Sequence, residues 1–157
     1  MIATPRLDEE EQRTWRLFAA ALRRLRCQLD RDLQRDAGMP TTYYELLQLL
    51  AEAPERARRM SDLAEATRSI PSRISHAVGQ LEQAGWVRRE LCSHDRRGWF
   101  AVLTDAGAAA LEAAAPGHEE SLRRNLFDRL SPAQVAELRG IAEALLSEHP
   151  GRGEGGC

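Results

Sequence analysis

The chain has 157 residues, of which 43% are hydrophobic and 29% charged, and its formal net charge is −2. This length suits one domain, or one domain with an added oligomerisation segment. No apolar run approaches the length of a membrane span, and the first residues lack the basic start and apolar core of a secretion signal, so we expect a cytoplasmic protein. The cysteines, Cys27, Cys92 and Cys157, are far apart and odd in number, which predicts no disulfide framework.

A long helix is predicted over residues 8–36. Its apolar side chains recur every three or four positions and form one seam: Trp15, Phe18, Leu22, Leu25, Leu29 and Leu33. A seam of this length exceeds what a small domain needs, so it can pack on the following helices or pair with a second subunit. After a break at residues 38–41, Thr42 and Glu45 have the spacing of a capping box for the next helix.

Two short helices, a tight turn between them and a β-hairpin are predicted in the middle of the chain. We expect residues 55–59 to be a charged connector and Ser61 to cap the first helix. Pro71 suits the first turn of the second helix and Gly85 its end, and Ile74, Ala77, Val78 and Leu81 mark its inward face. Strands at residues 86–91 and 98–103, joined by the polar tip 93–97, complete a winged helix-turn-helix, which predicts nucleic-acid binding.

The outward face of the second helix supports this interpretation. It carries side chains that can donate to phosphates or base edges: Ser72, Arg73, Ser75, His76 and Gln80. Residues 69–80 contain no acid, whereas an ordinary solvated helix face usually mixes acids and bases. Gly79 lowers helix propensity and suggests a close approach, either to DNA or to a neighbouring helix.

Charge is unevenly distributed along the chain. Residues 55–100 contain nine arginines against six acidic residues, and the remainder contains thirteen arginines against eighteen acidic residues. Because the local electrostatic field governs nucleic-acid binding, the pattern predicts a basic DNA-binding region at residues 55–100 and an acidic remainder of the chain. Beyond the hairpin, Thr104 should cap an alanine-rich helix that Pro116 and Gly117 either end or kink. The pair Ser131-Pro132 should then begin a last helix that reaches about residue 148.

Several motifs resemble the MarR family of dimeric bacterial transcription regulators. They are Leu63-Ala64-Glu65, then Leu81-Glu82-x-x-Gly85-Trp86-Val87-x-Arg89, and Asp95-x-Arg97 followed by Leu103-Thr104-x-x-Gly107. The resemblance implies a mainly α fold with a small β-hairpin wing (α+β), flanked by N- and C-terminal dimerisation helices. The expected segments are a dimerisation helix in 1–37, the winged helix-turn-helix in 38–105, dimerisation helices in 106–149 and a disordered tail in 150–157.

The resemblance also assigns functional roles. A homodimer is expected to bind a pseudo-palindromic double-stranded DNA operator and to act as a repressor, without a cofactor. Arg97 would enter the minor groove with Asp95 orienting it, Arg96 would face phosphate, and Arg89 would support the wing with Asp95 as its partner. A small phenolic or anionic effector could bind beside Trp15, Tyr43 and Tyr44. However, aromatic residues at helical spacing usually fill the core.

Other readings of the sequence stay open. Cys27 or Cys92 could be reactive thiols, although the stretch that matches the peroxide-sensing branch of the family contains no cysteine. Cys92, His94 and Asp95 are possible metal ligands, but a wing tip offers no fourth partner. A winged helix can also be a protein-docking module without DNA specificity. We do not expect an enzyme, because no nucleophile elbow or phosphate-binding glycine loop is present.

Overall fold

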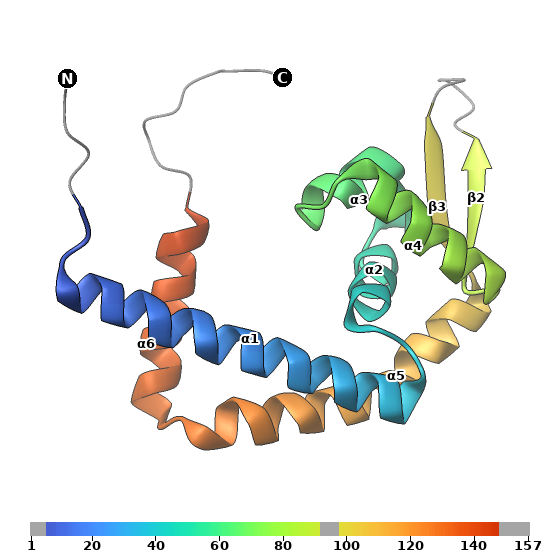
Figure 1. Ribbon diagram of the computed structural model, residues 1–157. Coiled ribbons are helices and arrows are strands. Elements are labelled where there is room, and N and C mark those ends of the chain that lie inside the picture. Colours follow the sequence, from blue (N-terminus) through green and yellow to red (C-terminus); the bar gives the residue numbers. More distant parts are fainter. Residues whose placement is uncertain (1–5, 92–97, 148–157) are drawn as a thin grey trace, which may run out of the picture.

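Most of the chain folds into helices, with one small antiparallel sheet. The computed structural model describes residues 6–91 and 98–147. The helices are α1 (Glu9–Ala37), α2 (Thr41–Ala51), α3 (Met60–Ala66), α4 (Pro71–Gln83), α5 (Asp105–Asn125) and α6 (Pro132–Leu146), with short 3₁₀ turns at η1 (Pro54–Arg56) and η2 (Phe127–Arg129). The strands are β1 (Ala57–Arg59), β2 (Val87–Leu91) and β3 (Trp99–Leu103). This architecture confirms the predicted winged helix-turn-helix, in which α3 and α4 precede the wing (Figure 1).

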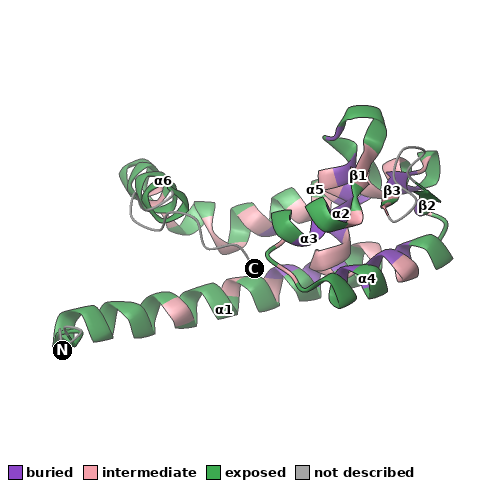
Figure 2. Cartoon of the chain, turned by 90° about the horizontal axis from the view of Figure 1, so that it is seen from above, coloured by how far each residue is buried: buried purple, intermediate pink, exposed green. Residues whose placement is uncertain are grey.

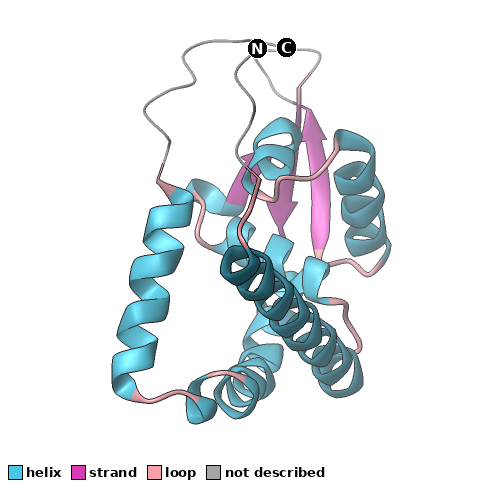
Figure 3. Ribbon diagram, turned by 60° about the vertical axis from the view of Figure 1, so that its left-hand side comes forward, coloured by secondary structure: helices cyan, strands magenta, loops and turns pink. Residues whose placement is uncertain are grey.

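The reading head (residues 38–105) lies at one end of two long helices. Figure 1 shows α1 and α5 running along its base, with α4 and the wing on the opposite side. The N-terminal half of α1 extends beyond the head, and α6 stands apart from the head after the loop that follows α5 (Figure 3). Within the described residues, no helix is both long and apolar enough to cross a membrane.

The hydrophobic core sits inside the reading head and reaches only the C-terminal part of α1. Its buried members include Leu33, Tyr44, Leu46, Leu47, Leu50, Leu63, Ile74, Val78, Leu81, Val87 and Leu103. Along the predicted seam of α1, Trp15 is 61% exposed, Phe18 43% and Leu33 only 2%. Figure 2 shows the same gradient from exposed to buried along the helix. One half of the seam therefore packs in the core, and the other half faces solvent in the single chain.

The sheet contains one strand more than the hairpin that the sequence predicts. Its order is β1-β3-β2, with Ala57 opposite Val102 and Leu91 opposite Trp99. The prediction of a charged connector at residues 55–59 was wrong for its last three residues, which pair with β3. A strand of three residues is too short to show alternation of polar and apolar side chains, so the pattern carried no signal for it.

Two of the predicted helix caps were also wrong. Helix α2 begins at Thr41 rather than after Thr42, and the Thr41 N–H donates to Asp30 Oδ1 of α1 at 2.9 Å. Helix α3 begins at Met60, so Ser61 lies inside it and its hydroxyl donates to Asp62. In contrast, Thr104 and Ser131 cap α5 and α6 as predicted. A long-range partner such as Asp30 can replace a local cap, and local spacing cannot reveal it.

A buried carboxylate fastens α1 to α5. Asp32 is 1% exposed and accepts hydrogen bonds from the Ser121 hydroxyl at 2.6 Å and from Arg124 Nη2 at 3.0 Å, both on α5. Gln28 and Arg35 on its own helix donate to its other oxygen. The Ser121 hydrogen bond and these neighbours outweigh the effect of burial and lower the pKa of Asp32 to about 2. Helix α5 meanwhile runs unbroken through Pro116.

Candidate nucleic-acid interface

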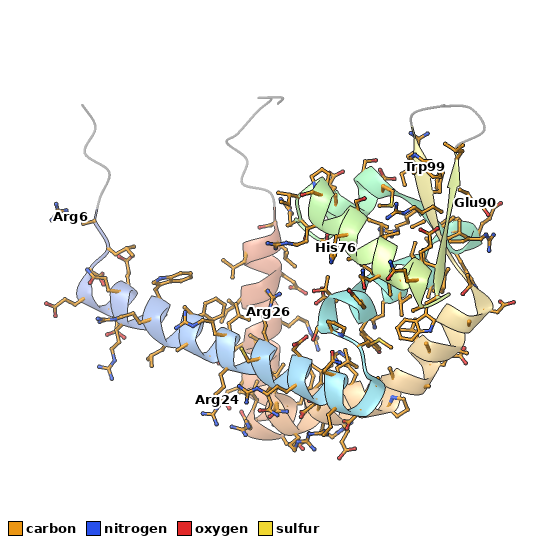
Figure 4. All side chains as sticks on the ribbon, turned by 45° about the vertical axis from the view of Figure 1, so that its right-hand side comes forward. Arg6, Arg24, Arg26, His76, Glu90 and Trp99 are labelled. Carbon is orange, nitrogen blue, oxygen red and sulfur yellow. The ribbon has the colours of Figure 1, made fainter. Side chains whose placement is uncertain are left out.

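Helix α4 presents a polar face to solvent and buries the opposite one. Ile74, Ala77, Val78 and Leu81 are buried, as their spacing predicts. The predicted DNA-contacting side chains Ser72, Arg73, Ser75 and His76 are exposed, and Gln80 is half-buried on the same helix. Figure 4 labels His76 on α4. These hydroxyl, guanidinium, imidazole and amide groups are all available to donate to a ligand.

The turn before α4 is tightly fixed by its main chain. Arg68 adopts the left-handed conformation with φ 50°, and the Ser69 N–H donates to the Ala64 carbonyl at 2.9 Å. Ile70 is the N-cap residue of α4 and Pro71 occupies its first turn. The direction of the helix relative to α3 is therefore set by hydrogen bonds and by the fixed φ of proline.

Arg89 of β2 clamps the wing onto α4. Its Nη2 donates to the Ser75 main-chain oxygen at 2.6 Å, and its Nε lies 3.7 Å from Glu82 Oε2. A Cβ at Gly79 would lie 3.4 Å from the same Nη2. Within the protein, the close approach that Gly79 suggested is made by the Arg89 side chain rather than by a neighbouring helix. Asp95, the partner predicted for Arg89, lies outside the described residues.

The root of the wing is locked to the start of α5. The Thr104 hydroxyl donates to the Gly85 carbonyl at 2.7 Å and accepts the Gly107 N–H at 3.0 Å. The Thr104 N–H donates to the Trp86 carbonyl at 3.0 Å. A Cβ at Gly107 would overlap that same carbonyl oxygen, so only glycine fits there. These contacts give a physical reason for the spacing Leu103-Thr104-x-x-Gly107.

A groove of about 560 Å³ separates α4 from the wing. Its lining includes Arg59, Ser61, Ser75, Arg89 and Trp99. The Arg59 guanidinium lies 5.6 Å from the centre of the Phe100 ring. The groove thus combines hydroxyl groups and arginine side chains, of which Arg89 is already engaged with Ser75 and Glu82 of α4.

Similarity to other proteins agrees with this geometry. Residues 37–98 match the MarR family. Sco3205 from Streptomyces coelicolor, a MarR family transcriptional regulator solved in complex with DNA, is 50% identical, with a TM-score of 0.84 over 92% of this chain and 94% of that one. AbsC, a MarR family regulator from the same organism, is 43% identical, with a TM-score of 0.80 over 90% and 98% of the two chains. This chain belongs to the MarR family of transcriptional regulators. The uncharacterised HTH-type regulator YkoM of Bacillus subtilis is 26% identical over 134 residues, which are 83% of this chain and 84% of YkoM.

The predicted DNA-contacting residues of the wing tip are not part of the described structure. Arg96, Arg97 and Asp95 fall between residues 92 and 97, as do Cys92 and His94 of the possible thiol and metal sites. In the described part of this MarR wing, the outermost cross-strand pair is Leu91 and Trp99. Both side chains are apolar and exposed, at 59% and 46%. Figure 4 shows Trp99 near the end of the wing.

The three aromatic residues of the predicted effector site lie in different surroundings. Tyr44 is 3% exposed, and its ring centre lies 4.5 Å from that of His118 on α5. Tyr43 is half-buried against the core. Trp15 is exposed beside Phe18 and precedes the core residue Leu33 by 18 positions, or about 27 Å of helix at 1.5 Å per residue. The single chain therefore keeps Trp15 away from the two tyrosines.

The predicted thiol Cys27 lies on the exposed side of α1. It is a free cysteine and lines a groove of about 300 Å³ between α1 and α2, together with Asp30, Thr41 and Glu45. Within residues 6–91 and 98–147, no three histidine, cysteine or acidic side chains come together as metal ligands would.

Proposed function

We propose that this MarR family protein is a homodimeric repressor that binds a pseudo-palindromic operator in double-stranded DNA. The observation that carries the proposal is the exposed polar face of α4, which has no acidic residue before Glu82 and presents Ser72, Arg73, Ser75 and His76 on a helix that Arg89 fixes to the wing. The 50% identity to Sco3205, which was solved with DNA, supports it.

In this proposal, two copies of α4 enter successive major grooves about one helical turn apart. Arg73 and Gln80 then contact phosphates or base edges, and Arg97 enters the flanking minor groove, where narrow A·T-rich segments attract arginine. Arg96 faces phosphate. A dimer in this position would occlude the promoter, which is the physical basis of repression.

The homodimer is proposed from the unpaired apolar surface. Exposed large apolar side chains gather on the outer half of α1 and at the end of α6: Trp15, Leu17, Phe18, Leu22, Ile141, Leu145 and Leu146. Single exposed apolar residues are ordinary, but this number of large ones on two helices that stand outside the core supports an interface. Two-fold pairing of these helices would cover these side chains and place the two reading heads symmetrically.

An effector would act on the separation of the two heads. A small phenolic or anionic molecule that binds the DNA-free arrangement more tightly would lower operator affinity by that difference. The dimer helices meet the head near Tyr43, Tyr44 and Cys27, so ligand binding or thiol oxidation there would shift the same equilibrium. The test is whether an effector lowers operator affinity while sedimentation still shows a dimer.

The deciding experiment is selection of bound fragments from random double-stranded DNA, followed by a salt titration on the selected operator. We expect an enriched pseudo-palindrome and a steep fall of affinity with salt. Arg73→Ala and Arg97→Ala should each weaken binding by about 1–3 kcal/mol without unfolding the protein, whereas Arg13→Ala, on the outer half of α1, should not. A folded protein that enriches no sequence would instead support the protein-docking alternative.

A further inference from the structure

We infer that Ile70, at the start of α4, reads a thymine through its C5 methyl group. This inference rests on the proposed DNA binding and adds a specificity-determining residue to it. Its side chain carries no hydrogen-bond donor or acceptor, so any contact that it makes with DNA is apolar.

The first observation is exposure. Ile70 is 62% exposed, although isoleucine is among the residues most often buried. Among the described residues, the other exposed large apolar side chains lie on or before α1, on η2 and α6, or in the pair Leu91 and Trp99 of the wing. Ile70 alone lies at the turn of the helix-turn-helix, between α3 and α4.

The second observation is the identity of the residue at this position. Ile70 is the N-cap residue of α4, where serine, threonine, asparagine or aspartate would satisfy a free N–H of the helix. An isoleucine side chain cannot do so. The position therefore gives up a local stabilising contact and presents hydrocarbon to solvent, which indicates a role outside the single chain.

The third observation is rigidity. The Ile70 carbonyl accepts the N–H groups of Arg73 at 3.0 Å and Ile74 at 3.3 Å, and Pro71 follows it directly. On its other side, Ser69 is held by the hydrogen bond to Ala64. The side chain thus projects from a fixed main chain and loses little conformational freedom when it meets a surface.

The chemistry of the major groove then selects the partner. The N-terminal residues of a recognition helix contact base edges, and Ser72 and Arg73 are exposed at the same end of α4. The apolar group that a base pair presents in the major groove is the thymine C5 methyl. An exposed isoleucine beside Ser72 and Arg73 can pack against that methyl group. The operator should therefore have a thymine at the corresponding position of each half-site.

The experiment uses the full-length protein and its selected operator, with each thymine of one half-site replaced in turn by deoxyuridine, which lacks only the methyl. For the wild type we expect one position at which the loss of the methyl weakens binding about fourfold, the value of one buried methyl group. Ile70→Ala should bind the thymine and deoxyuridine operators equally, within about twofold, and Ile70→Val should respond to an intermediate degree.

Leu91→Ala is the matched control, because it truncates an equally exposed apolar side chain of the same head. Whatever it does to affinity, its response to deoxyuridine should remain that of the wild type. The inference is overturned if the wild type ignores every methyl of the half-site, or if the Ile70→Ala and deoxyuridine effects multiply. Failure of the proposed DNA binding is a separate result, since it would show earlier, as a selection that enriches no operator. Thermal unfolding of Ile70→Ala checks that the variant is folded.

Discussion

The guanidinium of Arg89 donates a 2.6 Å hydrogen bond to the main-chain oxygen of Ser75, in the middle of the exposed face of α4. The same arginine pairs with Glu82, the penultimate residue of that helix, and its main-chain N–H donates to the Glu82 carboxylate at 3.3 Å. Arg89 of β2 therefore holds α4 at two points, the Ser75 carbonyl and the Glu82 carboxylate. The wing and α4 should consequently move as one unit when they meet DNA.

Arg89→Ala should weaken DNA binding through geometry rather than charge. Loss of the hydrogen bonds made by a charged donor should lower the free energy of unfolding by about 1.5–3 kcal/mol and also lower operator affinity. Because Arg89 is engaged with α4, the slope of log affinity against log salt should stay unchanged. Urea unfolding and a salt titration measure the two quantities. A slope reduced by about one would instead place Arg89 on a phosphate.

Gly79→Ala should stabilise the protein. Alanine is favoured over glycine inside a helix by about 1 kcal/mol, and the added Cβ would meet Arg89 Nη2 at 3.4 Å, an ordinary contact distance. Gly79→Ile places more atoms in the path of the guanidinium and should reproduce the Arg89→Ala behaviour. Urea unfolding of both variants gives the result. Destabilisation by the alanine would show that the arginine has no room to adjust.

The sequence predicted those parts of the molecule whose pattern is local. The spacing of Ile74, Ala77, Val78 and Leu81 identified α4 and its exposed face, and Ser131-Pro132 identified the start of α6. It did not predict the features that depend on distant partners. The cap of α2 comes from Asp30, and Arg89 binds a main-chain oxygen, which no side-chain pattern can indicate.

Gly107→Ala should destabilise the fold, in contrast to Gly79→Ala, which makes the same change within a helix where there is room. The new Cβ would overlap the Trp86 carbonyl oxygen, so the wing root and α5 would have to separate. Overpacking of this kind costs about 1–3 kcal/mol. Denaturant unfolding of the two variants side by side provides the comparison. If Gly107→Ala were as stable as the wild type, the main chain at Trp86 would have to shift away from the new Cβ at no cost in free energy.

A charge placed on the apolar face of the outer helices should separate the proposed dimer. Leu145→Glu, at a position that is 70% exposed in the single chain, would bury an unpaired carboxylate between subunits, which costs several kcal/mol. We expect a folded monomer by sedimentation, with operator affinity lowered at least tenfold because each head then binds alone. Leu91→Glu, on the wing, is the control and should remain dimeric. If the Leu145→Glu protein remains dimeric, the interface between the subunits does not include Leu145.

Asp32 should make the stability of the protein depend on acid. In the folded chain its pKa is lowered from 3.8 to about 2, first by the Ser121 hydrogen bond and with help from Gln28, Arg124 and Arg35, against the opposing effect of burial. A carboxylate whose pKa is lower in the folded state stabilises fully above its unfolded pKa. That stabilisation is lost as the pH falls from 3.8 through about 2. Asp32→Asn should therefore lower stability at pH 7 and flatten the loss of stability over this range.

The nearby exposed carboxylate supplies the matched control. Asp36 pairs with Arg35 at 2.7 Å but is 43% exposed, so Asp36→Asn should change stability by less than about 1 kcal/mol. Asp32→Ala, which leaves the buried Ser121 hydroxyl without its acceptor, should cost about 1–3 kcal/mol. Urea unfolding at a series of pH values separates the variants. Parallel stability profiles for Asp32→Asn and the wild type would mean that Asp32 is not the group that titrates, and the tie between α1 and α5 would then rest on packing alone.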